Sequence, residues 1–184
     1  MRIISGKARG TKLETLEGLD TRPTLDRVKE SLFSIIQGYV YDATVLDLFS
    51  GSGALALESL SRGAKKAYSY DNSKKAIEII KNNAKKTHLE EKIIIKNKDF
   101  KNALEEVENE KFDIIFLDPP YKTDFGLQAV KIIMEKDLLS KDGIIVFETD
   151  KDEKEYLEEL RKSSNIKDLR KYGRVTLVFL DRKE

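Results

Sequence analysis

The spacing of apolar residues along the chain predicts alternating strands and helices from residue 44 onward. Short apolar runs of strand length occupy 44–49, 66–70, 92–96, 112–117 and 143–148. The stretches between them have helical spacing and occupy about 54–62, 73–88, 100–108, 124–137 and 151–163. Because strands that alternate with helices are typical of βαβ units, we expect a doubly wound α/β fold with a parallel sheet.

The two ends of the chain depart from this alternation. Runs 166–171 and 174–180 flank Tyr172-Gly173, which predicts an antiparallel β-hairpin at the C-terminal end. At the N-terminal end, runs 2–5 and 11–15 surround two glycines and predict a β-hairpin or β-arm.

A helix is predicted over 25–37, before the first strand of the sheet. Leu25, Val28 and Leu32 recur at helical spacing, and Thr24 is the expected N-cap. Tyr39 and Tyr41 follow this helix and are expected to pack beside the first strand. We expect one domain over 1–184, with an arm at 1–20 and the α/β core at 44–184, since 184 residues suit a single domain.

Composition removes several kinds of chemistry. The chain has no cysteine, so disulfides, thiolate metal sites and cysteine nucleophiles are excluded. The chain has a single histidine, His88, which excludes sites that need two histidines. We expect His88 to be a surface residue at a helix end. No metal ion is expected. There is neither a run of 18 apolar residues nor a signal-peptide pattern, which favours a cytoplasmic protein.

Charge is distributed unevenly. The formal net charge of +1 argues against a surface that is basic throughout. Residues 1–12, however, contain four basic side chains and no acid, so the other residues together carry −3. This local excess favours an arm that contacts RNA phosphates, through Arg2, Lys7, Arg9 and Lys12.

A glycine-rich turn follows the first predicted strand. Gly51, Gly53 and Ala56 satisfy the G-x-G-x-x-G/A pattern, and Asp71 follows Gly51 by 20 residues. These features alone fit a nicotinamide-dependent oxidoreductase. Asp47, however, precedes the first glycine by four residues, and its carboxylate suits a ligand that carries a cation better than a pyrophosphate.

The sequence Asp118-Pro119-Pro120-Tyr121 ends the fourth predicted strand and is the most specific motif in the chain. Two prolines fix the backbone and donate no N–H, so rigid carbonyl groups, the Asp118 carboxylate and the Tyr121 ring surround one place. A planar base with an exocyclic amine fits such a site, because acceptors take the amine hydrogens while the ring stacks. This arrangement favours N-methylation of a base.

The pattern D-x-F-x-G-x-G resembles motif I of the S-adenosylmethionine-dependent methyltransferases and implies a Rossmann-like methyltransferase sheet. By that resemblance, the methionine end of S-adenosylmethionine is held by Asp47, Phe49, Ser50, Gly51 and Gly53. The ribose is held by Asp71 with Asn72 beside it, and the adenine by Asp99 and Phe100.

Three further segments narrow the resemblance. Residues 2–6 with Arg9-Gly10, residues 22–33 and residues 171–174 are similar to the small single-domain bacterial 16S ribosomal RNA guanine-N2-methyltransferases. The resemblance implies methyl transfer to a guanine N2 in 16S ribosomal RNA, either free or in an assembling small subunit. Arg22 and Arg27 are then expected to face the mouth of the active site.

Alternatives remain open from the sequence. The DPPY motif also occurs in adenine-N6 methyltransferases, so the motif does not itself choose guanine. An oxidoreductase leaves Asp47 and DPPY without a role, and a non-catalytic RNA-binding factor leaves an intact DPPY unexplained. We expect the enzyme to act as a monomer.

Overall fold

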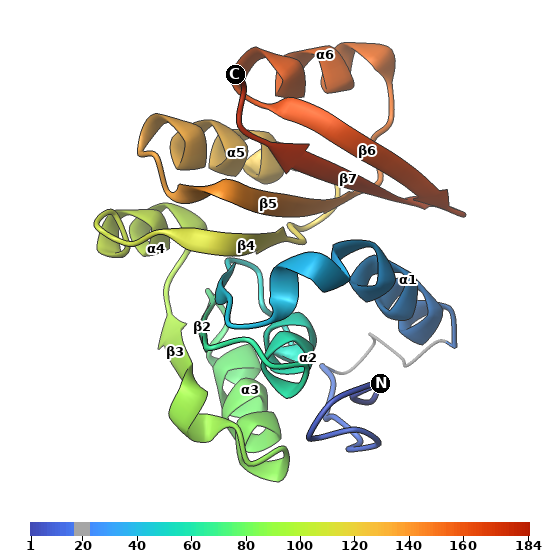
Figure 1. Cartoon of the computed structure of the whole chain (residues 1–184), viewed down its shortest axis with the longest axis vertical. Coiled ribbons are helices and arrows are strands. Elements are labelled where there is room, and N and C mark those ends of the chain that lie inside the picture. The colour runs from blue at the N-terminus through green and yellow to red at the C-terminus, as the bar shows by residue number, and fades with distance from the viewer. Residues whose placement is uncertain (17–22) are drawn as a thin grey trace.

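One seven-stranded sheet organises the computed structural model, which describes residues 1–16 and 23–184. The strand order is β3-β2-β1-β4-β5-β7-β6 (Figure 1). Strands β1 to β5 are parallel, whereas β7 is antiparallel to both β5 and β6. The strands are β1 Thr44–Asp47, β2 Lys66–Asp71, β3 Ile93–Asn97, β4 Phe112–Leu117, β5 Leu139–Thr149, β6 Asn165–Tyr172 and β7 Val175–Asp181.

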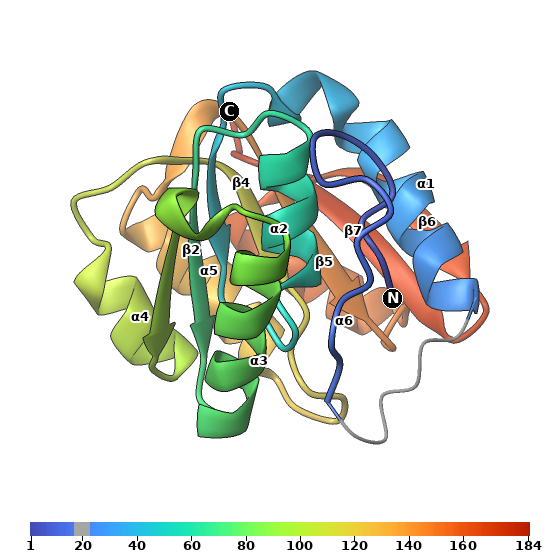
Figure 2. The ribbon, with the colours of Figure 1, turned by 90° about the horizontal axis from the view of Figure 1, so that it is seen from below.

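Helices cover both faces of this sheet, as predicted for a doubly wound fold (Figure 2). One face packs against α1 Pro23–Val40, α2 Ala54–Ser61 and α3 Lys74–Lys86. The other face packs against α4 Phe100–Glu106, α5 Phe125–Glu135 and α6 Lys154–Ser163. A short 3-10 helix, Glu90–Lys92, precedes β3. The predicted β-hairpin at the C-terminal end is present as β6 and β7.

The central strands are buried on both faces, which explains their continuous apolar sequences. In β4, every residue except Asp113 is buried, and from Ile114 to Leu117 the side chains alternate between the two cores. Strand β5 is longer than the predicted 143–148 and begins at Leu139. A shift of register between Phe112 and Ile114 lets residues before Gly143 continue the strand.

The first helix also exceeds its prediction. It begins at Pro23, so Thr24 lies within the first turn rather than at the N-cap position. Proline suits the first helical position, because that position needs no intrahelical N–H donor. Tyr39 is half-buried against the core, but the expected packing of Tyr41 is wrong, since its side chain is 86% exposed. The Tyr41 ring lies beside Gly63, outside the core.

The N-terminal arm forms a hairpin with a single β-bridge, between Arg2 and Lys12, rather than two full strands. The backbone N–H groups of Ile4 and Ser5 donate to the Glu58 carboxylate instead of a neighbouring strand. This carboxylate on α2 therefore takes the donors that a longer ladder would use. The arm lies along α2 as a result (Figure 2).

Glu58 is fully buried and holds several charges together. Its carboxylate forms ion pairs with Lys29 Nζ at 3.1 Å and with Arg62 Nε at 2.9 Å. Gly6 passes so close to α2 that an added Cβ would lie 1.9 Å from the Ser61 carbonyl oxygen. The arm is therefore fixed to the core by charge and by close backbone contact.

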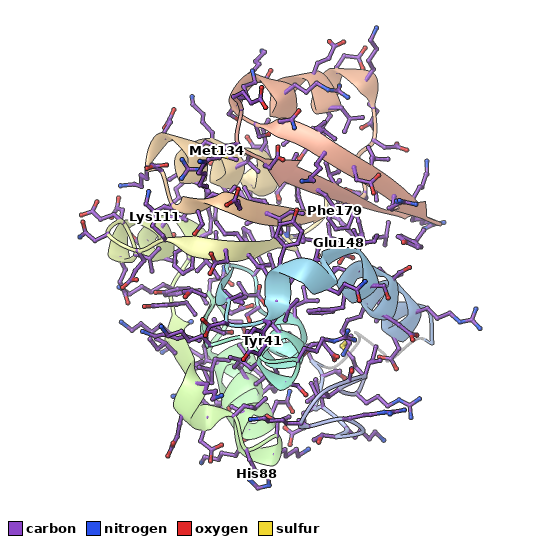
Figure 3. The ribbon with its side chains drawn as sticks, in the orientation of Figure 1. Tyr41, His88, Lys111, Met134, Glu148 and Phe179 are labelled. Carbon is purple, nitrogen blue, oxygen red and sulfur yellow. The ribbon has the colours of Figure 1, made fainter. Side chains whose placement is uncertain are left out.

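No helix within the described ranges combines the length and the apolar character required to cross a bilayer. His88 is exposed just after α3, as predicted, and adopts a left-handed φ of 57° (Figure 3).

Candidate active site

The glycine turn between β1 and α2 lies at the carboxyl edge of the parallel strands. Gly51 and Gly53 have φ of 58° and 80°, a region that glycine adopts without steric cost. The Gly51 N–H donates to Asp71 Oδ2 at 2.9 Å, which joins the ends of β1 and β2. An added Cβ on Gly51 would meet nothing within 4 Å, so the turn leaves open space there.

Asp47 is almost completely buried beneath this turn, with 1% of its surface exposed. Ser50 Oγ donates to Asp47 Oδ2 at 3.1 Å and also contacts Ser69 Oγ. The other oxygen, Asp47 Oδ1, is buried without a hydrogen-bond partner among the described residues. Burial raises the pKa of Asp47 to about 7, and the nearby Asp71 charge adds to the effect. An incoming cationic donor would satisfy both the orphan oxygen and the charge.

Asp71 occupies the end of β2, where its carboxylate is fixed by two backbone donors. One is the Gly51 N–H described above, and the other is the Ser73 N–H, which donates to Asp71 Oδ1 at 2.9 Å. Carboxylate oxygens have further lone pairs, so this arrangement leaves Asp71 able to accept ribose hydroxyls. Asn72 is exposed, and no described residue hydrogen-bonds to its side chain.

Three aromatic rings line the same edge beyond the glycine turn. The Phe49 and Phe100 ring centroids lie 5.5 Å apart, and Phe100 lies 5.2 Å from Phe125. Phe100 is buried, whereas Phe125 is 37% exposed. This row of rings offers an apolar surface for the flat face of a base.

Asp99 serves here as the N-cap of α4. Its Oδ1 accepts the N–H groups of Lys101 and Asn102, and the Asn102 side-chain amide donates to its Oδ2 at 2.6 Å. These hydrogen bonds lower the pKa of the Asp99 carboxyl. Asp99 is exposed and precedes Phe100. Its observed role is that of a helix cap, and its contact with adenine stays a prediction.

Asp118 lies directly after β4, near two other carboxyl groups. Its side chain keeps an accessible edge, but protein atoms crowd its carboxyl group. This burial, with the charges of Glu148 and Asp47, raises the pKa of Asp118 well above its ordinary value. Burial also raises the pKa of Glu148. The site therefore concentrates hydrogen-bond acceptors where a donor-rich ligand would be stabilised.

The rest of the DPPY loop is held in place by its neighbours. Pro119 is buried, and the Thr123 hydroxyl donates to the Pro120 carbonyl at 2.7 Å. Lys122 has a left-handed φ of 62°, which turns the chain back toward α5. Tyr121 is 52% exposed, so its ring face is available to a stacking partner.

The basic residues predicted to contact RNA lie on the surface wherever they are described. Arg2, Lys7, Arg9 and Lys12 are exposed, and within 1–16 and 23–184 none of these four side chains forms an ion pair. Arg27 is exposed near the start of α1. Arg22 lies outside the described residues.

Three residues of this region were missed by sequence reasoning. Glu148 and Phe125 carry no motif, although Phe125 follows the DPPY loop closely and is an exposed aromatic residue. Asn83, buried on α3, donates to the carbonyl oxygens of Glu14 at 2.9 Å and Ser52 at 2.8 Å. It therefore joins the arm to the glycine turn.

The donors present fit S-adenosylmethionine. The unpartnered Asp47 Oδ1 suits the amino group of its methionine part, and the open space at Gly51 allows close approach to the backbone. By contrast, the described residues contain no group of three or more acidic or histidine side chains that could hold a metal ion.

The strand order and the acid-and-glycine turn, together with the DPPY loop, define a Rossmann-like methyltransferase. A sequence profile described as "Conserved hypothetical protein 95" matches residues 1–181, and the chain belongs to this family. Membership confirms the family resemblance drawn from the motifs.

Relatives in this family are similar over most of their length. The chain is 40% identical over 154 residues to the "Putative rRNA methyltransferase YlbH" of Bacillus subtilis, covering 83% of this chain and 84% of that protein. It is 38% identical over 155 residues to the "Ribosomal RNA small subunit methyltransferase D" of Haemophilus influenzae, covering 83% of this chain and 80% of that protein.

Solved structures agree with the fold. A putative methyltransferase, yhhF from Escherichia coli, superposes with a TM-score of 0.85 at 27% identity, covering 100% of this chain and 98% of that one. A putative methyltransferase in complex with SAH has a TM-score of 0.69 at 17% identity, covering 87% of this chain and 50% of that one. This second likeness concerns the fold alone.

Proposed function

We propose that the protein transfers a methyl group from S-adenosylmethionine to the exocyclic N2 amine of a guanine in 16S ribosomal RNA, in the cytoplasm. The observation that carries the proposal is the pairing of a cation-seeking acid, Asp47, with the acceptor Asp118 at one sheet edge. The names of the curated relatives, which specify ribosomal RNA of the small subunit, support the substrate class.

The β1 and β2 ends would hold the cofactor, which supplies an electrophilic methyl group on a sulfonium. Asp47 pairs with the amino group, while the backbone of 49–53 surrounds the methionine part. Asp71 accepts the ribose hydroxyls, and Phe49 and Phe100 border the adenine plane. Each hydrogen bond to a charged group contributes about 1.5–3 kcal/mol.

The DPPY loop would hold the base. Asp118 accepts one hydrogen of the amine, and a carbonyl of the proline pair accepts the other. Both contacts favour a pyramidal nitrogen whose lone pair faces the methyl group. Tyr121 stacks on the base, and the rigid loop fixes its position, so alignment of the reactants contributes about 7–11 kcal/mol. The product nitrogen then loses its proton to water or to a nearby carboxylate.

The arm and the start of α1 would bind the RNA around the target. A base inside a helix cannot reach Tyr121, so the guanine must be unstacked or flipped. The four exposed cations on the arm suit contacts to RNA phosphates. We propose that this local grip, in a protein with a net charge of +1, selects one structured site.

Methyl transfer to undermodified 16S RNA tests the proposal. With labelled S-adenosylmethionine, the native protein is expected to label guanine N2, and Asp118→Ala is expected to lose most of this activity. Asp142→Ala, which removes an exposed carboxylate near the start of β5 and away from its carboxyl end, is the matched control. Full activity of Asp118→Ala would contradict the assigned role, and labelling of adenine would contradict the substrate.

A further inference from the structure

Glu148 lies at the carboxyl end of β5, next to the DPPY loop in the register of the sheet. Strands β4 and β5 pair in parallel, with Phe116 beside Val146 and Leu117 beside Phe147. Phe116 and Val146 both belong to the core on the α1 side of the sheet. Because side chains alternate along a strand, Asp118 and Glu148 are the next pair on that same side.

The Glu148 carboxylate is half-buried yet has no partner. Across the described part of the chain, no residue hydrogen-bonds to it or forms an ion pair with it. Its cross-strand neighbour on β7 is Leu177, which is fully buried and offers no side-chain donor. Its charge acts on both Asp118 and Tyr121, so the three groups lie near one another. Its oxygens are therefore free to accept hydrogen bonds from a ligand.

A second acid with an unsatisfied oxygen lies in the same row. Asp47 follows the α1-side alternation of β1 and pairs in register with Phe116. Its Oδ1 is buried without a described partner. The adjacent strands β1, β4 and β5 thus place three acids in one row at their carboxyl ends, namely Asp47, Asp118 and Glu148.

The base itself specifies what that group is. On its Watson–Crick edge, guanine presents the N1–H donor directly beside the N2 amine. Adenine has an acceptor at N1, which a carboxylate repels. Flipped bases are read by hydrogen bonds to this edge, and acids read N–H donors. A carboxylate next to Asp118 therefore separates guanine from adenine, which the DPPY motif does not.

We propose that Glu148 is the specificity-determining residue of the site, accepting the N1–H of the target guanine while Asp118 accepts from its N2 amine. This inference rests on the proposed function. It assigns the choice of base to the end of β5 and the chemistry to the end of β4.

A base analogue provides the test. 2-Aminopurine keeps the amine at position 2 but has an acceptor at N1 and no oxygen at C6, so a change in base preference on substituting Glu148 alone reports the N1 contact. RNA substrates with guanine or 2-aminopurine at the mapped position are methylated by the native protein and by Glu148→Gln, Glu148→Asp and Glu155→Gln. Glu155 is exposed on α6 and is the matched control.

The native protein and Glu155→Gln are expected to prefer guanine by about 10- to 100-fold in kcat/KM, the range for hydrogen bonds to a charged group. Glu148→Gln is expected to lose about 10- to 100-fold on guanine and to reduce the preference to within a few-fold, because its amide can donate to the analogue's N1. Glu148→Asp keeps an acceptor and should retain the preference at a lower rate.

An unchanged guanine preference in Glu148→Gln, with normal cofactor affinity, would overturn the inference and leave the proposed function intact. Loss of the preference in Glu148→Asp together with a normal preference in Glu148→Gln would do the same. If the native protein forms no N2-methylguanine in any RNA, the proposed function fails first. Cofactor affinity and melting temperature of each variant show that it is folded.

Discussion

The buried acid Asp47 gives a prediction in which stability and ligand binding change in opposite directions. Asn is nearly isosteric with Asp and can still accept the hydrogen bond from Ser50 Oγ, but it carries no charge. We expect Asp47→Asn to weaken S-adenosylmethionine binding about 10- to 150-fold, since it removes a charge-assisted contact. The same change should stabilise the cofactor-free protein.

The size of the stabilising effect follows from the pKa of Asp47. Burial raises this pKa from 3.8 to about 7 in the folded protein, so the folded state binds more protons than the unfolded state between these values. Stability from protonated Asp47 is complete below pH 4 and is lost as pH rises through 7. The penalty for ionised Asp47 is about 2 kcal/mol at pH 5 and about 4 kcal/mol at pH 8.

Urea unfolding of cofactor-free protein at pH 5 and pH 8 measures this effect. Because the other consequences of the substitution do not depend on pH, the stability advantage of Asp47→Asn should grow by about 2–3 kcal/mol between the two conditions. Asp42→Asn is the control, since Asp42 is exposed and its left-handed φ of 58° suits asparagine. An advantage that is equal at both pH values would refute the raised pKa and its role in attracting a cation.

Three further predictions concern the cofactor site, the arm and the core. Asp71→Ala should weaken S-adenosylmethionine binding about 10- to 150-fold in calorimetry, and unchanged affinity would remove Asp71 from the site. Glu58→Ala leaves the buried Lys29 unpaired and should lower the free energy of unfolding in urea by about 3–5 kcal/mol; a loss below 1 kcal/mol would contradict the charge network. Neutralising the four basic residues of the arm, Arg2, Lys7, Arg9 and Lys12, should reduce the slope of log RNA affinity against log salt concentration by about 3. An unchanged slope would exclude phosphate contacts by these residues.

Much of the geometry of the proposed cofactor site could be predicted from the sequence, because it depends on local features. A strand, a glycine turn and a helix follow one another in the chain, so Asp47, Ser50 and Gly51 had to lie together. Asp71 was also predictable, since parallel neighbouring strands end at one edge. The hydrogen bond from Gly51 to Asp71 agrees with that expectation.

Features that depend on pairing between distant segments could not be predicted in this way. Glu148 gains its meaning from the register of β5 against β4, which no motif in either segment records. The arm's limited pairing depends on Glu58, more than 50 residues away. Asp99 shows a different limit, because an acid after a strand serves equally well as a helix cap and as a ligand.

Mass mapping of methylated nucleosides tests the central claim most directly. 16S RNA from a strain that lacks the protein is compared with the same RNA after incubation with purified protein and S-adenosylmethionine. We predict that one N2-methylguanosine is missing in the first sample and restored in the second, and that Asp118→Ala does not restore it. Restoration of a methyladenosine, or no difference between the two samples, would contradict the account.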